Sequence, residues 1–501
     1  MENNLVEIFF DQAKRFPDHT AIIHKNESIS YKLLQKKVQA TANYLSKKGI
    51  RKSTKVLVFI PMSIKLYQTV LALFSIGAIV VFVDEWADKR RLNKALQVVD
   101  VECIIAPRKL LWLGYILNPF RKIKTKLSIP IKLESNPFDF IKVQPEDTAL
   151  ITFTTGSTGL PKAANRTHQF LWQQFRILKD EIGSKPSEKC LSTLPIVLLC
   201  ILGTGATAVI ADFNQKKPHK LDVESMLKFL KVAQVQLLIA SPFFIEKITE
   251  KKNTKLPALR KILTGGAPVF PKLAQKINMA FPKSKNMIAY GSTEAEPISI
   301  MMMEELVTKH SSMENGLAVG DIHPDIKIKI IKIADGQIEL DKMGWTIWEL
   351  ENGEVGEIIV AGPHVLTSYF NSDEAFKLNK IKDDETIWHR TGDGGRIIDS
   401  TLFLLGRCNQ FIRDVNKIIS PFIIENQLSS ITGVSIGTLL KANDKKWIVV
   451  EAEVGSNKNN IMEEITKLKL GQDEIHFVEQ IPRDPRHFSK IEYSKILQQI
   501  S

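Results

Sequence analysis

Apolar residues recur at helical spacing through much of the first 300 residues, and short continuous apolar runs separate these segments. The clearest case follows Ser30, a residue type that commonly caps a helix N-terminus. One helical face after it carries an apolar stripe formed by Leu34, Val38, Ala42 and Leu45. The spacing therefore predicts an amphipathic helix that begins after Ser30 and packs this stripe against a core.

Helical and strand-like segments then alternate as far as about residue 292. The continuous apolar runs are KVLVFI, AIVVFVD, VECIIAP, TALITF, GATAVIA, VQLLIAS, KILTGGA and NMIAYGSTE. Continuous apolar strands between amphipathic helices are typical of parallel sheets that helices cover on both faces. Ligands of such sheets bind where the strands end. The pattern predicts an α/β fold with a ligand site at the carboxyl ends of its strands.

The hydrophobic pattern changes near Ile326. Apolar and polar residues alternate there in the runs IKIKIIKI, WTIWELE and GEIIVAGP, which predicts an antiparallel β region. A shorter α+β segment follows the run LFLLGRCNQ. We therefore expect a large domain over residues 1–406, made of parallel α/β subdomains and a β subdomain. A small, mobile α+β domain is expected over residues 407–501.

Two apolar stretches, Leu66–Val83 and Leu194–Ala211, are each near the shortest length that can cross a bilayer. The first contains Gly77 before a β-branched run, and the second contains Pro195 and Gly203. Each is predicted as a buried helix followed by a buried strand rather than as a membrane span.

Composition describes an ordinary globular protein, with 44% hydrophobic and 25% charged residues. The amino terminus lacks the basic region and apolar core of a secretory signal. The cysteines form no CxxC pair, which argues against a disulfide framework or a zinc site; they are Cys103, Cys190, Cys200 and Cys408. These features favour a cytoplasmic protein.

A formal net charge of +13 suggests an anionic partner, but no basic recognition motif appears, and we expect no nucleic acid partner. Most lysines are spread over polar helix faces. Arg108–Lys126 differs, because aromatic and aliphatic side chains interleave with basic ones. This segment either rests on anionic lipid as a peripheral membrane contact or packs as a surface helix on its own domain.

The stretch LITFTTGSTGLPKAANRTH, Leu150–His168, is rich in hydroxyls and glycines. Glycines let the backbone approach an anion, and hydroxyls and backbone N–H groups can donate to its oxygens. It is not a Walker loop, because Gly156 and Gly159 are separated by two residues and Ala163 follows Lys162. These residues taken alone predict either a phosphate loop of another kind or only a turn.

Six segments decide between these alternatives, because they occur in a characteristic order: TFTTGSTGLPKAANRTH, YGSTEAE, GEIIVAGP…SYF, WHRTGDGGR, GRCNQFI and RDPRHFSKIEY. Together they resemble the adenylate-forming superfamily of acyl-CoA synthetases, peptide-synthetase adenylation domains and luciferases, over nearly the whole chain. The resemblance implies an ATP-dependent ligase that attaches AMP to a carboxylic acid, such as a fatty acid, releases pyrophosphate and then transfers the acyl group. It also implies Mg²⁺, with coenzyme A as one candidate acceptor.

The resemblance also implies roles for individual residues. Donors to the leaving pyrophosphate would come from one loop, formed by Thr154, Thr155, Gly156, Ser157, Thr158, Gly159 and Lys162. Glu294 matches the Mg²⁺ ligand of the family, and a carboxylate is a hard ligand for this hard cation. Thr293 would donate to the α-phosphate.

On the nucleoside side, the resemblance implies a backbone wall against adenine formed by Gly265, Gly266 and Ala267, with Tyr290 stacked near the base and Gly291 as a further nucleotide-binding residue. Asp393 would accept from the ribose hydroxyls with help from Arg407. Lys490 matches the mobile catalytic lysine, which reaches the reacting oxygens only when the small domain closes.

Three departures from the family pattern affect the second half-reaction. Asn409 occupies the usual hinge position, Asn416 stands where a glycine lines the pantetheine tunnel, and LPIVLLC has no histidine after LP. These departures resemble the olefin-biosynthesis branch, which adenylates a β-hydroxy fatty acid and closes a β-lactone with its own hydroxyl. The open hypotheses are an acyl-CoA ligase, a β-lactone synthetase and a non-catalytic nucleotide-binding scaffold. The scaffold is disfavoured by the joint presence of Lys162, Glu294, Asp393 and Lys490.

Overall fold

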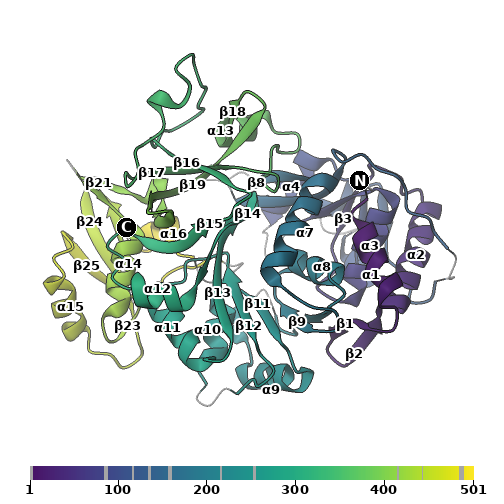
Figure 1. Cartoon of the computed structure of the whole chain (residues 1–501), viewed down its shortest axis with the longest axis horizontal. Coiled ribbons are helices and arrows are strands. Elements are labelled where there is room, and N and C mark those ends of the chain that lie inside the picture. The colour runs from purple at the N-terminus through teal and green to yellow at the C-terminus, as the bar shows by residue number, and fades with distance from the viewer. Residues whose placement is uncertain are drawn as a thin grey trace.

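A computed structural model of the chain describes residues 4–83, 89–114, 118–133, 137–155, 161–214, 217–251, 255–414, 417–442, 444–484 and 490–500. Side chains of residues 89–91, 112–114, 118–119, 155, 161, 414 and 417 are outside this description. The chain folds into α/β layers in which helices pack between and around two large sheets (Figure 1).

The first sheet has six strands among the described residues, parallel except for the last pair. In spatial order they are β6 (Thr125–Leu127), β5 (Cys103–Ile105), β3 (Lys55–Val58), β4 (Ile79–Phe82), β7 (Thr148–Thr155) and β8 (Pro161–Thr167). Helices α4 (Lys89–Val99), α5 (Arg108–Gly114) and α6 (Asn118–Arg121) connect its strands. The carboxyl end of β7 leads into the hydroxyl- and glycine-rich loop.

The second sheet is mixed and runs across both the parallel and the antiparallel regions. Its parallel part comprises β13 (Lys285–Ser292), β12 (Lys261–Gly265), β11 (Leu237–Ala240), β9 (Lys189–Ser192), β10 (Thr207–Ile210) and β1 (Thr20–His24), which β2 (Glu27–Ser30) borders. Its antiparallel part comprises β14 (Ala295–Met302), β15 (Leu317–Ile322), β20 (Thr401–Arg407), β19 (Thr386–Ile398), β18 (Lys380–Asp383), β17 (Gly356–Ala361) and β16 (Lys327–Ile331). The predicted β region therefore continues the parallel sheet through the β13–β14 hairpin.

Five helices form a layer between the two sheets and share one core with both. They are α1 (Val6–Arg15), α2 (Tyr31–Lys47), α3 (Ile64–Ile76), α7 (His168–Ile182) and α8 (Pro195–Gly203). The predicted stripe on α2 is fully buried, and the Ser30 hydroxyl accepts from the backbone N–H of Leu33 at 3.3 Å, as expected of an N-cap. The outer face of the second sheet carries α9 (Val223–Ala233), α10 (Pro242–Thr249), α11 (Pro271–Ala280) and α12 (Met303–Lys309).

The two long apolar stretches each form a helix followed by a strand, as predicted: α3 with β4, and α8 with β10. Gly77 ends α3 in the left-handed conformation, with a φ of 69°. Within the described residues, no helix is both long and apolar enough to cross a membrane.

One predicted strand is wrong. Residues 344–347, which include the first three residues of the run WTIWELE, form a 3₁₀ turn, and Glu349 forms an isolated bridge with Ile331 of β16. The cause is tertiary: the indole N–H of Trp345 donates to Asp383 at 2.8 Å, and its ring packs edge-on against Trp388. These contacts hold the segment away from the extended conformation that its alternation favours.

The residues after Cys408 surround a core of their own, in the yellow-green part of Figure 1. The elements there are the hairpin β21 (Ile412–Asp414) and β22 (Lys417–Ile419), the sheet β23 (Val434–Ala442), β24 (Lys445–Ala452) and β25 (Glu474–Val478), and helices α14 (Pro421–Ser430), α15 (Lys458–Lys467) and α16 (Tyr493–Ile500). Polar contacts among the described residues that join this unit to the larger part include Lys272 donating to the carbonyl of Ser429 at 2.8 Å and the hydroxyl of Ser420 donating to the carbonyl of Leu405 at 2.7 Å.

Candidate active site

A cavity of about 2110 Å³ lies where the end of β7, the start of β8 and the loops after β12 and β13 meet β19, β20 and the C-terminal unit. The predicted site residues that line it are Thr154, Lys162, Gly265, Gly266, Ala267, Tyr290, Gly291, Thr293, Glu294, Asp393, Arg407 and Lys490. Thr155 ends β7, while Gly156, Ser157, Thr158, Gly159 and Asn416 lie outside the described residues. The structure thus brings together side chains that are more than 300 positions apart in the chain.

Close backbone approach explains two of the glycines. A Cβ on Gly265 would lie 2.3 Å from the carbonyl oxygen of Ala289 on the neighbouring strand. A Cβ on Gly291 would lie 2.6 Å from the carbonyl oxygen of Ala295. Neither position can carry a side chain without shifting the β12–β13–β14 backbone, so both glycines keep this wall of the cavity thin.

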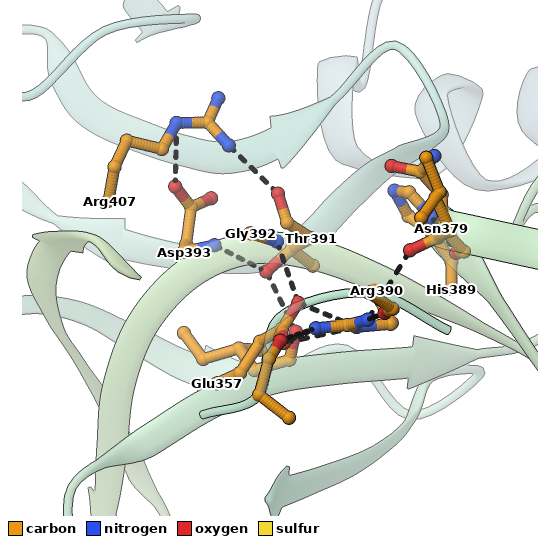
Figure 2. Close-up of polar contacts among 12 residues, drawn as sticks. Glu357, Asn379, His389, Arg390, Thr391, Gly392, Asp393 and Arg407 are labelled. Atoms are coloured by element: carbon orange, nitrogen blue, oxygen red, sulfur yellow. Dashed lines mark hydrogen bonds and ion pairs between the residues drawn. The ribbon is translucent and has the colours of Figure 1, made fainter. Parts of the chain in front are cut away.

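On the nucleoside side, Asp393 holds the centre of a polar cluster (Figure 2). Its carboxylate accepts from the phenol of Tyr290 at 2.9 Å and lies 3.2 Å from Nε of Arg407. The Asp393 carboxylate raises the pKa of Arg407, and burial raises the pKa of Tyr290 well above its ordinary value. Asp393 is therefore an anionic acceptor held in a fixed orientation in the cavity wall.

A buried ion pair beneath this cluster was not predicted from the sequence. Arg390 and Glu357 are 8% and 3% exposed, and two guanidinium nitrogens of Arg390 donate to the carboxylate at 2.6–3.2 Å (Figure 2). Glu357 also accepts from the backbone N–H of Gly392 at 3.3 Å. The pair anchors the part of β19 that carries Asp393. The only hint in the sequence is that Arg390 immediately precedes the TGD motif.

At the other end of the cavity, the carboxylate of Glu294 accepts from the hydroxyl of Thr154 at 3.1 Å and of Tyr369 at 3.2 Å. Burial alone would raise the pKa of Glu294. His389, which is protonated only in the acid range where Glu294 titrates, and the ammonium groups of Lys162 and Lys380 outweigh this effect, and the pKa of Glu294 falls to about 2. Glu294 is therefore an ionised carboxylate beside hydroxyl oxygens.

This donor set fits a hard cation that keeps water and phosphate oxygens as its other ligands, as Mg²⁺ does. It does not fit an all-protein cage, since the described residues contain no group of three or more His, Cys, Asp or Glu side chains that could hold a metal. Lys162, the predicted phosphate contact, donates to the side chain of Asn379 at 2.6 Å. Its pKa is lowered by burial.

Two ionisable side chains beside Glu294 were also missed. Lys380 is 2% exposed and donates to the carbonyl of Leu366, and burial lowers its pKa to about 7. His389 pairs with Lys380 across β18 and β19, and burial lowers its pKa to about 3, so the imidazole is neutral. The sequence gives no signal for either residue, because both occupy strand positions where apolar side chains are usual.

Lys490 comes from the C-terminal unit. Its backbone N–H donates to the carboxylate of Asp484 at 2.8 Å, and the backbone N–H of Asp484 donates back to its carbonyl at the same distance. Residues 485–489 lie outside the described part of the chain. The two bonds join the backbones of Asp484 and Lys490, and the exposed Lys490 side chain lines the cavity.

The cavity also has an apolar arm between the two sheets. Its walls come from β3 and the following loop, α3 and the start of α8; they include Val58, Ile60, Met62, Leu66, Val70, Leu194, Ile196, Val197 and Leu199. The buried Arg166 lines it too, and donates to the carbonyl of Thr293 at 3.0 Å. The arm thus joins an aliphatic lining to the residue beside Glu294.

Comparison with known proteins gives a consistent result. The family model described as AMP-binding enzyme matches residues 9–370. An olefin β-lactone synthetase of Stenotrophomonas maltophilia is 27% identical over 81% of this chain and 77% of its own length. A putative acyl-CoA ligase of Bacillus subtilis is 25% identical over 93% of each chain.

Solved structures share the fold. An amide bond synthetase of Marinactinospora thermotolerans superposes with a TM-score of 0.83 at 18% identity, over 99% of this chain and 100% of its own. The o-succinylbenzoate CoA synthetase of Bacillus subtilis, solved with its acyl-adenylate intermediate, gives 0.81 at 19% identity, over 98% and 97%.

Proposed function

The chain belongs to the AMP-binding enzyme family and is an adenylate-forming ligase, and we propose that its substrate is an aliphatic carboxylic acid. One observation carries the proposal: a single cavity joins the polar wall of Asp393 and Glu294 to an arm lined by aliphatic side chains. Burial of a hydrocarbon chain in such an arm contributes about 0.8 kcal/mol per methylene group.

In the proposed first step, a carboxylate oxygen of the acid attacks the α-phosphorus of ATP. The bond to the β-phosphate oxygen breaks, and pyrophosphate leaves with that electron pair. In this proposal Thr154 and Lys162 donate to the leaving group. A Mg²⁺ ion held by Glu294 would neutralise charge on the phosphate oxygens. Asp393 accepts from the ribose, and Lys490 donates to the oxygens that become more negative in the transition state.

ATP–pyrophosphate exchange with a series of straight-chain acids tests this step. We expect exchange to rise with chain length until the arm is filled and to vanish without acid. Exchange with short polar acids, and none with aliphatic ones, would contradict the assignment of the arm.

We propose a β-hydroxy fatty acid as the specific substrate, with its own hydroxyl as the acyl acceptor. The β-hydroxyl oxygen would attack the activated carbonyl carbon, the bond to AMP would break, and a β-lactone would form with loss of the hydroxyl proton. Proximity within one bound molecule replaces binding of a second substrate. The β-lactone synthetases among the relatives, Asn409 at the hinge position and the absence of histidine from LPIVLLC favour this alternative.

The acceptor is identified by following AMP release with and without coenzyme A, on matched plain and β-hydroxylated acids, with mass spectrometry of the products. The lactone proposal expects ATP-dependent turnover of the hydroxylated acid alone. Coenzyme A-dependent turnover of the plain acid, with a thioester product, would instead establish an acyl-CoA ligase.

We also propose that the Arg108–Lys126 segment contacts anionic lipid. Arg108, Lys109 and Leu110 are exposed on α5, and Leu110 also lines the cavity, so this surface is where an acyl chain would enter. Co-sedimentation with anionic vesicles at low and high salt tests the contact. Binding at low salt that is lost at high salt is expected, and no binding at low salt supports a surface helix.

A further inference from the structure

Two lysine ammonium groups lie near one tyrosine ring behind Glu294. Nζ of Lys380 lies 5.4 Å from the ring centroid of Tyr369, and Nζ of Lys162 lies 5.6 Å from the same centroid. The hydroxyl of this ring donates to Glu294 at 3.2 Å. With His389 neutral, the cluster holds two cations and one carboxylate in a region that water barely reaches.

The two lysines differ in access. Lys162 lines the cavity, where phosphate oxygens would offer it a partner. Lys380 does not line the cavity and is held behind its wall by the carbonyl of Leu366. Its charge acts on the cavity from behind the wall, through its interactions with Glu294 and Lys162. A buried ammonium ion is costly, and the attraction of Glu294 offsets part of that cost.

We propose that the ammonium group of Lys380 competes with the divalent cation for the negative charge of Glu294. This competition weakens metal binding by Glu294, so that metal and pyrophosphate leave after adenylation. The inference rests on the proposed role of Glu294 as metal ligand. Like charges repel strongly where the effective dielectric constant is low. The protonated Lys380 ammonium group behind the carboxylate reduces the affinity of the carboxylate for a second cation on the cavity side.

A purely structural role for Lys380 predicts something different. If its only task is to donate to Leu366 and support Tyr369, its loss disorders Glu294, and metal binding weakens or stays the same. If it competes with the metal, removal of its charge strengthens metal binding. The sign of the change in metal affinity therefore separates the two roles.

The experiment measures Mn²⁺ binding to the full chain saturated with a non-hydrolysable ATP analogue, by the loss of the free Mn²⁺ resonance in electron paramagnetic resonance. Lys380→Met and Lys380→Gln remove the charge, and Gln keeps a donor for Leu366 if Met fails to fold. Lys382→Met is the matched control, because Lys382 is exposed on the same strand. We expect half-saturation at a Mn²⁺ concentration at least about tenfold lower in the Lys380 variants, with Lys382→Met like the wild type.

Unchanged or weaker Mn²⁺ binding in the folded Lys380 variants would overturn the inference. Glu294→Gln separates this result from failure of the proposed metal site. If Glu294→Gln weakens Mn²⁺ binding and the Lys380 variants do not tighten it, only the competitor role is wrong. If Glu294→Gln has no effect, the metal site itself is wrong.

Discussion

Arg407 and Asp393 are directly opposite one another in the β19–β20 ladder, and their side chains meet at 3.2 Å on the cavity side. The guanidinium of Arg407 also donates to the carbonyl of Thr391 at 2.8 Å, so it ties the Asp393 carboxylate to the preceding residues of β19 (Figure 2). The orientation of this acceptor is therefore set by strand pairing before any nucleotide binds.

Asp393→Ala is expected to weaken ATP binding by about 1 to 3 kcal/mol, because the ribose hydroxyls lose their acceptor in a buried site. Calorimetric titration with a non-hydrolysable ATP analogue measures the change. Asp321→Ala, at an exposed position of the same sheet, is the control and should bind like the wild type. Equal affinities for the two variants would remove Asp393 from the nucleotide site.

Glu294→Gln is expected to act differently, by lowering turnover and raising the Mg²⁺ concentration needed for half-maximal rate. The neutral amide keeps the size of the side chain but is a far weaker ligand for a hard cation. Rates of pyrophosphate exchange over a Mg²⁺ series check this. A variant with normal Mg²⁺ dependence and weaker ATP affinity would require the roles of Glu294 and Asp393 to be exchanged.

Lys490→Ala is expected to lower the adenylation rate constant by about 100-fold or more, while the dissociation constant for ATP changes little. The lysine comes from the C-terminal unit. Its positive charge is needed beside the oxygens that become more negative in the transition state. Single-turnover formation of the adenylate and equilibrium binding of ATP give the two quantities separately. Lys495→Ala, at an exposed position on α16, is the control. Near-normal adenylation by Lys490→Ala would contradict the assignment.

The buried carboxyl group of Glu425 is expected to make the free energy of unfolding depend on pH. Glu425 is 7% exposed, accepts from the hydroxyls of Thr438 and Tyr493, and burial raises its pKa from 4.5 to about 7. The folded state therefore favours the protonated form. The stabilisation is complete below pH 4.5 and is lost as the pH rises through about 7, a loss of about 3 kcal/mol.

Thermal unfolding of wild type and Glu425→Gln across this pH range tests the prediction. The amide can still accept from both hydroxyls but does not titrate, so the variant should lack this part of the pH dependence and be the more stable protein above neutral pH. Parallel curves for the two proteins would show that Glu425 does not titrate with the expected shift.

The elements that the sequence predicted well are those fixed by local spacing. The α2 stripe and the Ser30 cap depend on residues within one helix, and both are present as predicted. The 3₁₀ turn at Trp345 was missed because Asp383 and Trp388, which hold it, are about 40 positions away. Long-range contacts of this kind leave no periodic signal.

The residues of the site likewise fall into those that the sequence predicted and those that it did not. Asp393 and Glu294 belong to continuous motifs, and the structure gathers them in one cavity. Lys380 and the Arg390–Glu357 pair could not be predicted, because each matters through a partner on another strand. A buried lysine in a strand looks like an exposed one until the neighbouring strands are placed, since the sequence does not show which face is covered.

The Arg390–Glu357 pair has a practical consequence for engineering. Arg390 also donates to the carbonyls of Ala334 and Gly336, which form the root of the loop between β16 and β17, while Met343 near its tip is 57% exposed. Inserted peptides or attached dyes are tolerated best at exposed loop tips. A label at Met343 would leave the nucleotide wall intact, whereas shortening the loop at its root would shift Asp393.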